Sequence, residues 1–227
     1  PLHVCVAVPP HDGRDVAELW ENLNVTRTRA LSESTDNQDK RRVWFFDQET
    51  GRRAAERAIA LDGIARSLEQ YTLEAHFQPQ YRFDPDGEHV LVGFEALARW
   101  PNAPPSMNND DIIKAVGELG KLDMLNDYML RAAALFLRDW RARGNPPVVV
   151  SVNVSPGEFV RSKFVSVVAE VCGSYGVTPG ALEIEITEGT SFGELGRVAA
   201  TMMQLDSLGV RVALDDFGTG HANLNVL

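Results

Sequence analysis

Hydrophobic residues in the second half of the chain follow a repeated pattern of a strand and then a helix. Aliphatic runs lie at 147–155, 181–187 and 210–216, and the stretches 156–175 and 192–208 between them are predicted to be helical. Each strand with its following helix takes roughly 30 residues, the size of a βαβ unit. We therefore predict an α/β fold with a parallel sheet and crossover helices. The strands alternate little between apolar and polar residues, which favours burial on both faces.

A hairpin and a broken helix are predicted before these units. The runs 76–83 and 89–100 are β-like, and the turn that joins them, at 84–87, contains glycine. A long helical region follows at 110–143, with a break near Gly120. This part of the chain is therefore expected to begin with an antiparallel pair of strands.

The first residues give a smaller pattern of strand, helix and strand. A β-like run at 2–8 and another at 42–46 flank a helical stretch at 14–31. The pattern is too short to build a full core of its own. We interpret residues 1–47 as a small α+β fragment.

A connecting helix is predicted between this fragment and the main domain. Apolar residues recur at steps of three and four through 51–73, with arginine and glutamate on the other side. The predicted division is a fragment at 1–47, a connecting helix at 48–72 and a domain at 73–227. The apolar stripe of the helix either packs within the chain or pairs with the same helix of a second subunit.

Composition narrows the class of partner. The formal net charge of −10 argues against binding of polymeric nucleic acid, which needs a basic face. A small anionic ligand stays possible where metal ions or local arginines neutralise it. The two cysteines, Cys5 and Cys172, have no metal-binding spacing, which predicts a reducing compartment and hence a cytoplasmic location.

The sequence predicts no membrane span, because no apolar run approaches the roughly 18 residues that a span needs. The chain begins at Pro1 and not at a methionine, so it is expected to be part of a longer protein. A membrane anchor or a sensor domain upstream of residue 1 therefore stays open.

Oxygen-bearing side chains recur where the predicted strands end. Glu95 interrupts the apolar run of the second hairpin strand, and Asn153 lies near the end of the next strand. Glu185 and Asp215 follow after 32 and 30 residues, one βα unit each. The carboxyl ends of parallel strands share one edge of a barrel, and active sites lie there. These side chains are therefore expected to converge.

Such a cluster predicts a divalent metal ion. Unpaired carboxylates brought together there would repel one another and lose solvation, and a cation relieves both effects. The ligands are all oxygen, without cysteine or a histidine at a strand end, which favours Mg²⁺ or Mn²⁺ over Zn²⁺. Asp216 follows Asp215 directly and precedes a glycine-rich turn at 217–220, so both can reach the cluster and one can bridge two ions.

Each residue alone also has a simpler interpretation. Glu188 is compatible with a helix cap, and Asp215 and Asp216 with turn chemistry. Asn153 is compatible with the start of a helix, and Arg99 with a surface charge. The recurrence of an oxygen ligand on four successive strands is what favours a shared site.

Five motifs in order resemble those of EAL-type cyclic di-GMP phosphodiesterases. FEALARW (94–100) resembles the family signature E-A-L-x-R-W, and FQPQ (77–80) resembles Y-Q-P-[IL]. NVS (153–155), EITE (185–188) and DDFGTG (215–220) resemble three further family motifs. The resemblance extends from about Leu73 to the end. It implies a (β/α)8 TIM-type barrel, of which this chain holds only a part.

The resemblance also implies hydrolysis of cyclic di-GMP to linear pGpG, with two ions of Mg²⁺ or Mn²⁺. It implies a homodimer formed through the EAL domain, with a loop at 215–220 that links the metal site to dimerisation. By resemblance the metal ligands are Glu95, Asn153, Glu185, Asp215 and, at the second ion, Asp216; the dinucleotide contacts are Gln78, Leu97 and Arg99; and the catalytic residues are Glu95, Asp215 and Glu188, the last of which orders the loop.

The sequence departs from the family pattern in places. Phe77 replaces the signature tyrosine, Val116 replaces a glutamate, and HANL stands at 221–224 where the family has Y-S-S-L. The family's lysine and last glutamate would lie beyond Leu227, so we expect the chain alone to be inactive. The alternatives are an inactive cyclic di-GMP receptor and a regulatory or scaffold domain.

Residues 1–47 resemble the C-terminal tail of a GGDEF domain. VCVAVPPHDGRDVAELW (4–20) is similar to the family's stretch before its last helix, whereas NVTRTRALSES (24–34) replaces the expected lysine-containing segment. The resemblance implies a degenerate cyclase domain upstream of the phosphodiesterase domain.

Overall fold

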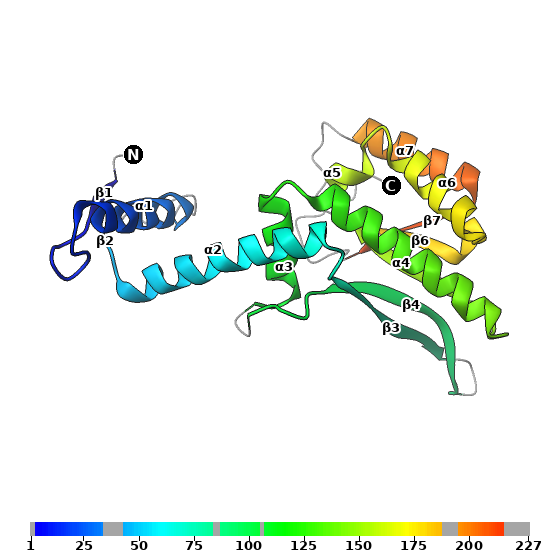
Figure 1. Ribbon diagram of the computed structural model, residues 1–227. Helices are drawn as coiled ribbons and strands as arrows, with labels where there is room; N and C mark the ends of the chain where they lie inside the picture. Colours follow the sequence, from blue (N-terminus) through cyan, green and yellow to red (C-terminus); the bar gives the residue numbers. More distant parts are fainter. Residues whose placement is uncertain (1–2, 34–42, 84–86, 105–106, 188–194, 216–227) are drawn as a thin grey trace. The chain divides into compact units, whose positions relative to one another are not determined.

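The computed structural model describes residues 3–33, 43–83, 87–104, 107–187 and 195–215. The chain divides into two compact units, Pro1–Gly63 and Ile64–Leu227 (Figure 1). Among the described residues, no helix is both long enough and apolar enough to cross a membrane.

The first unit is built around a parallel pair of short strands. It contains β1 (Val4–Val6), α1 (Val16–Glu33), β2 (Val43–Phe45) and the first part of α2 (Gln48–Glu69). Parallel strands need a crossover connection, and α1 supplies it by packing on both strands. The predicted order of strand, helix and strand is confirmed.

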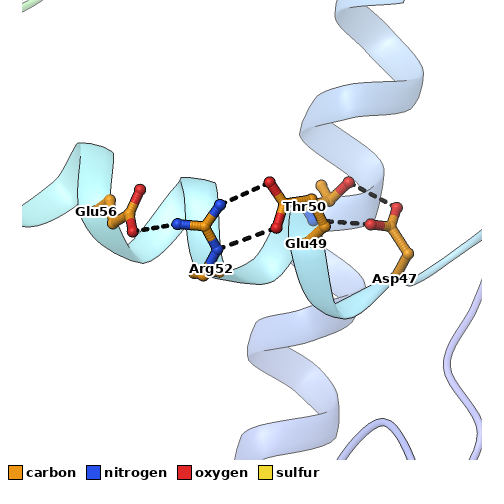
Figure 2. A network of polar contacts seen from close by, with 5 residues as sticks. All are labelled: Asp47, Glu49, Thr50, Arg52 and Glu56. Carbon is orange, nitrogen blue, oxygen red and sulfur yellow. Dashed lines mark hydrogen bonds and ion pairs between the residues drawn. The ribbon is translucent and has the colours of Figure 1, made fainter. Parts of the chain in front are cut away.

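The start of α2 is fixed by Asp47. Its carboxylate accepts hydrogen bonds from the backbone N–H of Thr50 at 2.8 Å and from the Thr50 hydroxyl at 2.6 Å (Figure 2). Arg29 of α1 donates to the same carboxylate at 2.6 Å. The bonds from Thr50 in particular hold the pKa of Asp47 below its ordinary value. Asp47 therefore caps the helix and ties it to α1.

Arg52 extends this polar network along the first turns of α2. Its guanidinium lies between Glu49 and Glu56, three residues before it and four after, and bonds to both (Figure 2). All three side chains are largely exposed. Such pairs support a helix by a few tenths of a kcal/mol each, about 0.2–0.5 kcal/mol.

The second unit is a five-stranded sheet with helices. Its elements are β3 (Glu74–Phe83), β4 (His89–Arg99), α3 (Asn109–Glu118), α4 (Leu122–Ala142), β5 (Val149–Val154), α5 (Pro156–Phe159), α6 (Phe164–Tyr175), a 3-10 turn (Pro179–Ala181), β6 (Leu182–Thr187), α7 (Leu195–Leu208) and β7 (Arg211–Asp215). The strand order is β3-β4-β5-β6-β7, with β3 antiparallel to β4 and the others parallel. The predicted hairpin and βα units are confirmed, and the described strands form an open sheet, not a closed barrel.

The predicted break near Gly120 separates α3 from α4. Asn108 and Asp111 cap the start of α3 reciprocally through side chain and backbone. The helix ends at Glu118 with Leu119 as its C-cap, and Gly120 has a φ of 64°, a conformation that favours glycine. The chain then turns directly into α4.

One face of the sheet is covered by helices. α4, α6 and α7 lie along this side (Figure 1), with α4 packed on β4 and β5 and α7 on β7. Val150, Val152 and Ile184, which point to this side, are fully buried. On the other face Glu183 and Glu185 are only half-buried. The expectation of strands buried on both faces is therefore not met in β6, where apolar and acidic residues alternate strictly.

Candidate functional site

The register of β3, β4 and β5 places three predicted site residues on the face away from the helices. Gln78 on β3 lies opposite Glu95 on β4, and Glu95 lies beside Ser151 on β5. Asn153 is two residues beyond Ser151, so it points to the same side. The opposite side is identified by Phe94, whose ring packs edge-on against a ring of α4.

The next two strands continue this face. Asn153 lies beside Glu185 on β6, and Glu185 lies beside Ala213 on β7. Asp215 is two residues beyond Ala213 and pairs with Thr187, so its position belongs to the same face, near the carboxyl ends of the strands. The register of four strands therefore places these positions on one face of the sheet.

Glu95 and Asn153 are joined directly. The side-chain amide of Asn153 donates a hydrogen bond from Nδ2 to Oε1 of Glu95 at 2.8 Å, and both side chains are half-buried. The bond uses the amide N–H and leaves the Asn153 Oδ1 and the second Glu95 oxygen as acceptors. Two oxygen donors are thereby held at a fixed separation, which suits a hard cation.

This bond decides between two interpretations of Asn153. A residue that merely starts a helix would direct its side chain to the backbone of that helix. Instead Ser155 stands at the N-cap of α5, and Asn153 remains within β5 with its side chain bonded across to β4. The interpretation of Asn153 as a helix start is wrong.

Ser151 is a site-face residue that the sequence analysis missed. Its side chain is fully buried, and its Oγ has no hydrogen-bond partner among the described residues. A buried hydroxyl without a partner costs about 1–3 kcal/mol. An oxygen-rich site that holds water or a hydrated cation would satisfy it. The sequence does mark this position, because Ser151 interrupts a run of valines two residues before Asn153 and therefore belongs to the same face of the strand.

The three predicted dinucleotide contacts also lie on this side of the hairpin. Leu97 and Arg99 are two and four residues beyond Glu95 on β4, and they pair with His76 and Glu74 of β3. Leu97 and Arg99 are half-buried, whereas Gln78 is exposed. The Arg99 guanidinium donates to the carbonyl of Ala98 at 2.9 Å.

Several predicted residues cannot be compared with the structure. Glu188, Asp216 and the loop 217–220 lie outside the described residues, and of Asp215 only the backbone is described. Within the described side chains, no three His, Cys, Asp or Glu residues gather closely enough to hold a metal ion. The described part of the cluster is thus two carboxylates, Glu95 and Glu185, with the amide of Asn153.

The departures from the family pattern that are described lie away from this face. Phe77 pairs with Ala96 and stacks on Phe136 of α4, with ring centroids 4.1 Å apart, so it belongs to the helix-covered side. Val116 is fully buried in α3. Residues 221–224 lie outside the described part of the chain.

Residues 62–227 match the family model of the EAL domain. The chain belongs to the EAL domain family. The match begins next to the boundary between the two compact units, so the second unit corresponds to the EAL domain.

Two curated proteins of Pseudomonas aeruginosa align with almost the whole chain. One is named cyclic di-GMP phosphodiesterase NbdA, is 29% identical over 99% of this chain and is covered over 28% of its own length. The other is named bifunctional diguanylate cyclase/cyclic di-GMP phosphodiesterase MucR, is 26% identical over 96% of this chain and is covered over 31%. The chain spans less than a third of the length of these relatives.

A solved structure supports the fold of the EAL domain. The structure titled PaMucR phosphodiesterase, c-di-GMP complex, superposes with a TM-score of 0.64 and 27% identity over 73% of this chain and 67% of that one. The EAL motifs lie at the same edge of the sheet: FEALARW ends β4, NVS ends β5 and EIT ends β6.

Proposed function

We propose that the EAL domain of this chain belongs to a metal-dependent phosphodiesterase that hydrolyses cyclic di-GMP to linear pGpG. The observation that carries the proposal is the shared face of Glu95, Asn153 and Glu185, with Glu95 and Asn153 joined at 2.8 Å. NbdA and MucR bear the name of this activity, and the MucR structure is a complex with cyclic di-GMP.

The residues on this face fit a divalent metal site. We assign Glu95, Asn153, Glu185 and Asp215 as ligands of Mg²⁺ or Mn²⁺, with Asp216 at a second ion. All five supply oxygen donors, and the buried hydroxyl of Ser151 adds a polar group that needs a partner there. When bound, the ions would polarise the phosphate oxygens and lower the pKa of an attacking water.

The chain's own residues would bind and orient the substrate. Arg99 presents a guanidinium at the end of β4, a group that matches phosphate oxygens in charge and geometry. Leu97 lies two residues before Arg99 on β4, and Gln78 lies on β3 opposite Glu95, where both would contact the nucleotide. Glu95 is held by Asn153, so its carboxylate is oriented before substrate arrives. Glu188 would order the loop 215–220.

A matched pair of substitutions on β6 tests this function. Glu185 and Glu183 lie two residues apart on the same strand and the same face, and only Glu185 is an assigned ligand. In the protein that carries this chain, Glu185→Gln should reduce formation of pGpG by about 100-fold, since loss of a metal ligand costs at least as much as loss of its supporting residues. Glu183→Gln should keep most of the activity.

The readout is chromatography of cyclic di-GMP and pGpG with Mg²⁺, with Mn²⁺ and with EDTA. Equal activity of the two variants would falsify the ligand assignment. Absence of hydrolysis by the unsubstituted protein with either metal, together with tight binding of cyclic di-GMP, would support the inactive receptor instead.

For the first unit we propose the C-terminal tail of a degenerate GGDEF domain at residues 1–47, joined by the helix at 48–72 to the EAL domain at 73–227. MucR, named as a diguanylate cyclase as well as a phosphodiesterase, aligns with nearly the whole chain. The parallel strands β1 and β2 with their crossover helix fit the edge of a larger α/β domain. A GGDEF signature loop upstream of Pro1 in the parent gene supports this division, and its absence opposes it.

We also propose that the EAL domain forms a homodimer in the cytoplasm. The support is the family resemblance of the loop at 215–220. Light scattering of the purified protein should give twice the mass of one chain, and a concentration-independent monomer would contradict the proposal.

A further inference from the structure

A pocket lies at the opposite edge of the sheet from the proposed metal site. Its volume is about 680 Å³, and its walls come from the end of α4, the loop before β5, the loop before β6 and Arg211 at the start of β7. Ala181 of this pocket comes directly before β6, and Glu185 lies four positions further along the chain, which corresponds to about 13 Å in an extended strand. The pocket is therefore separate from the catalytic face.

The pocket concentrates positive charge in an acidic protein. Among its described lining residues are three arginines, Arg138, Arg141 and Arg211, and none of the described lining residues carries a carboxylate. Arg138 shares its charge with Asp139 at 2.9 Å. Arg141 and Arg211 are exposed and make no ion pair within the described part of the chain, even though Glu183 is the register partner of Arg211. Two guanidinium groups are thus available to an anion.

Apart from Asn145 and Thr178, the other walls are apolar. Trp140 lines the pocket, and its indole Nε1 donates to the carbonyl of Pro146 at 2.7 Å. Its ring stacks on Phe136, with centroids 5.7 Å apart, which fixes its orientation. Pro147 and Val177 extend the apolar wall. A cavity of this size, mostly apolar with a few charged groups, is typical of small-molecule sites.

We propose that this pocket binds a small organic phosphate with an aromatic body, of the class of a nucleoside monophosphate. We assign Arg141 and Arg211, which both line the pocket, to the phosphate, because guanidinium groups suit phosphate in charge and geometry. The base lies against the wall of Trp140 and Pro146. The proposal does not depend on phosphodiesterase activity, because none of the residues assigned to that reaction lines the pocket.

Calorimetric titration of this chain with guanosine monophosphate in EDTA tests the proposal, because EDTA removes metal-dependent binding at the catalytic face. Saturable binding to one site is expected. Arg141→Gln and Arg211→Gln should each weaken it by about tenfold, the effect of one charge-assisted hydrogen bond. Both side chains are exposed, so the thermal midpoint should not change.

Two further arginines serve as controls. Arg143→Gln removes the same charge at the C-cap of α4 but outside the pocket, and Arg99→Gln removes it from the catalytic face. Both should bind guanosine monophosphate within about twofold of the unsubstituted chain, since neither contacts the ligand. If either variant lost as much affinity for guanosine monophosphate as Arg211→Gln, the proposal would be overturned. Such a loss would show non-specific attraction to positive charge or binding at the proposed metal site.

The two halves of the ligand are tested separately. Inorganic phosphate and guanosine should each bind at least about tenfold more weakly than guanosine monophosphate, because each lacks one set of contacts. Phosphate that binds as well as the nucleotide would refute the aromatic part of the proposal. If guanosine monophosphate shows no saturable binding, the pocket is only a solvated groove between two loops, and the proposal is refuted.

Discussion

The indole Nε1 of Trp100 donates a hydrogen bond to the Oγ of Ser67 at 2.9 Å, and both side chains are buried. Ser67 lies in the last turns of α2, and Trp100 directly follows β4, the strand that carries Glu95 and Arg99. Nearby, the Tyr128 hydroxyl donates to the carbonyl of Leu73 at 2.6 Å. The end of the connecting helix is thereby attached to the strand that carries the proposed site.

Ser67→Ala is expected to destabilise the second unit. The substitution leaves the buried indole N–H without an acceptor, which costs about 1–3 kcal/mol. Part of this loss is offset because alanine favours helix more than serine does, by about 0.5 kcal/mol or less. The free energy of unfolding in urea measures the net change.

Ser207→Ala on α7 is the matched control. Its hydroxyl bonds to a carbonyl of its own helix at 2.8 Å and is exposed, so its removal should change stability by less than about 0.5 kcal/mol. If Ser67→Ala lowered the free energy of unfolding no more than Ser207→Ala does, the buried hydrogen bond would contribute nothing measurable to stability.

Gly93→Ala should be destabilising for a steric reason. A Cβ at this position would lie 2.5 Å from the carbonyl oxygen of Val149 on β5 and 3.4 Å from Oε1 of Gln80. The first contact is with backbone, so β4 and β5 would have to separate, at a cost of about 1–3 kcal/mol. The unfolding free energy and the two-dimensional NMR shifts of β5 would report it.

Gly173 is the control, where substitution by alanine should raise stability instead of lowering it. Gly173 lies within α6 and is exposed, and a Cβ there would meet nothing within 4 Å. Gly173→Ala should stabilise the chain by roughly 0.5–1 kcal/mol, because it favours the helix. A loss of stability at Gly173, or no loss at Gly93, would contradict this steric account.

Much of the fold could be predicted because it depends on local patterns. The aliphatic runs of β5, β6 and β7 and the glycine between α3 and α4 specify their elements within a few residues. The shared face of Asn153 and Glu185 also followed, since parallel units of equal length align equivalent positions.

Other features could not be predicted, because they depend on tertiary contacts. The bond between Ser67 and Trp100 joins residues 33 apart, and no local pattern marks a helix serine as buried. Burial of Ser151 depends on its neighbours in the sheet. The pocket that Arg138, Arg141 and Arg211 line combines the end of α4 with the start of β7, two segments about 70 residues apart that only the pairing of β4, β5, β6 and β7 brings together.

Asp47→Ala should destabilise the first turn of α2, because it removes the carboxylate that accepts hydrogen bonds from Thr50. Loss of an N-cap costs about 1 kcal/mol, and partial exposure of Asp47 keeps the effect modest. Exchange of the Thr50 amide hydrogen measures it, since that N–H bonds to the Asp47 carboxylate. Asp47→Asn should keep most of the protection, because asparagine also caps helices.

The direction with pH follows from the lowered pKa of Asp47. The carboxylate contributes its stabilisation above the ordinary pKa of aspartate and loses it as the pH falls through the lower pKa of the folded state. The Thr50 amide of the unsubstituted chain should therefore stay protected from hydrogen exchange near neutral pH and lose that protection only in strong acid. In Asp47→Asn this acid step should disappear. An unchanged acid step in that variant would assign it to another group.

Asn153→Ala tests the proposed metal site through stability, without requiring turnover. Binding to the folded state alone adds about 2.7 kcal/mol when the metal concentration is about 100 times Kd. The unsubstituted chain should therefore unfold at a higher temperature in Mn²⁺ than in EDTA. The variant should show a smaller difference, because it lacks an oxygen ligand and no longer orients Glu95. Its midpoint in EDTA measures the separate cost of losing the hydrogen bond, so the two effects can be distinguished. An equal gain from Mn²⁺ in both chains would place the metal elsewhere.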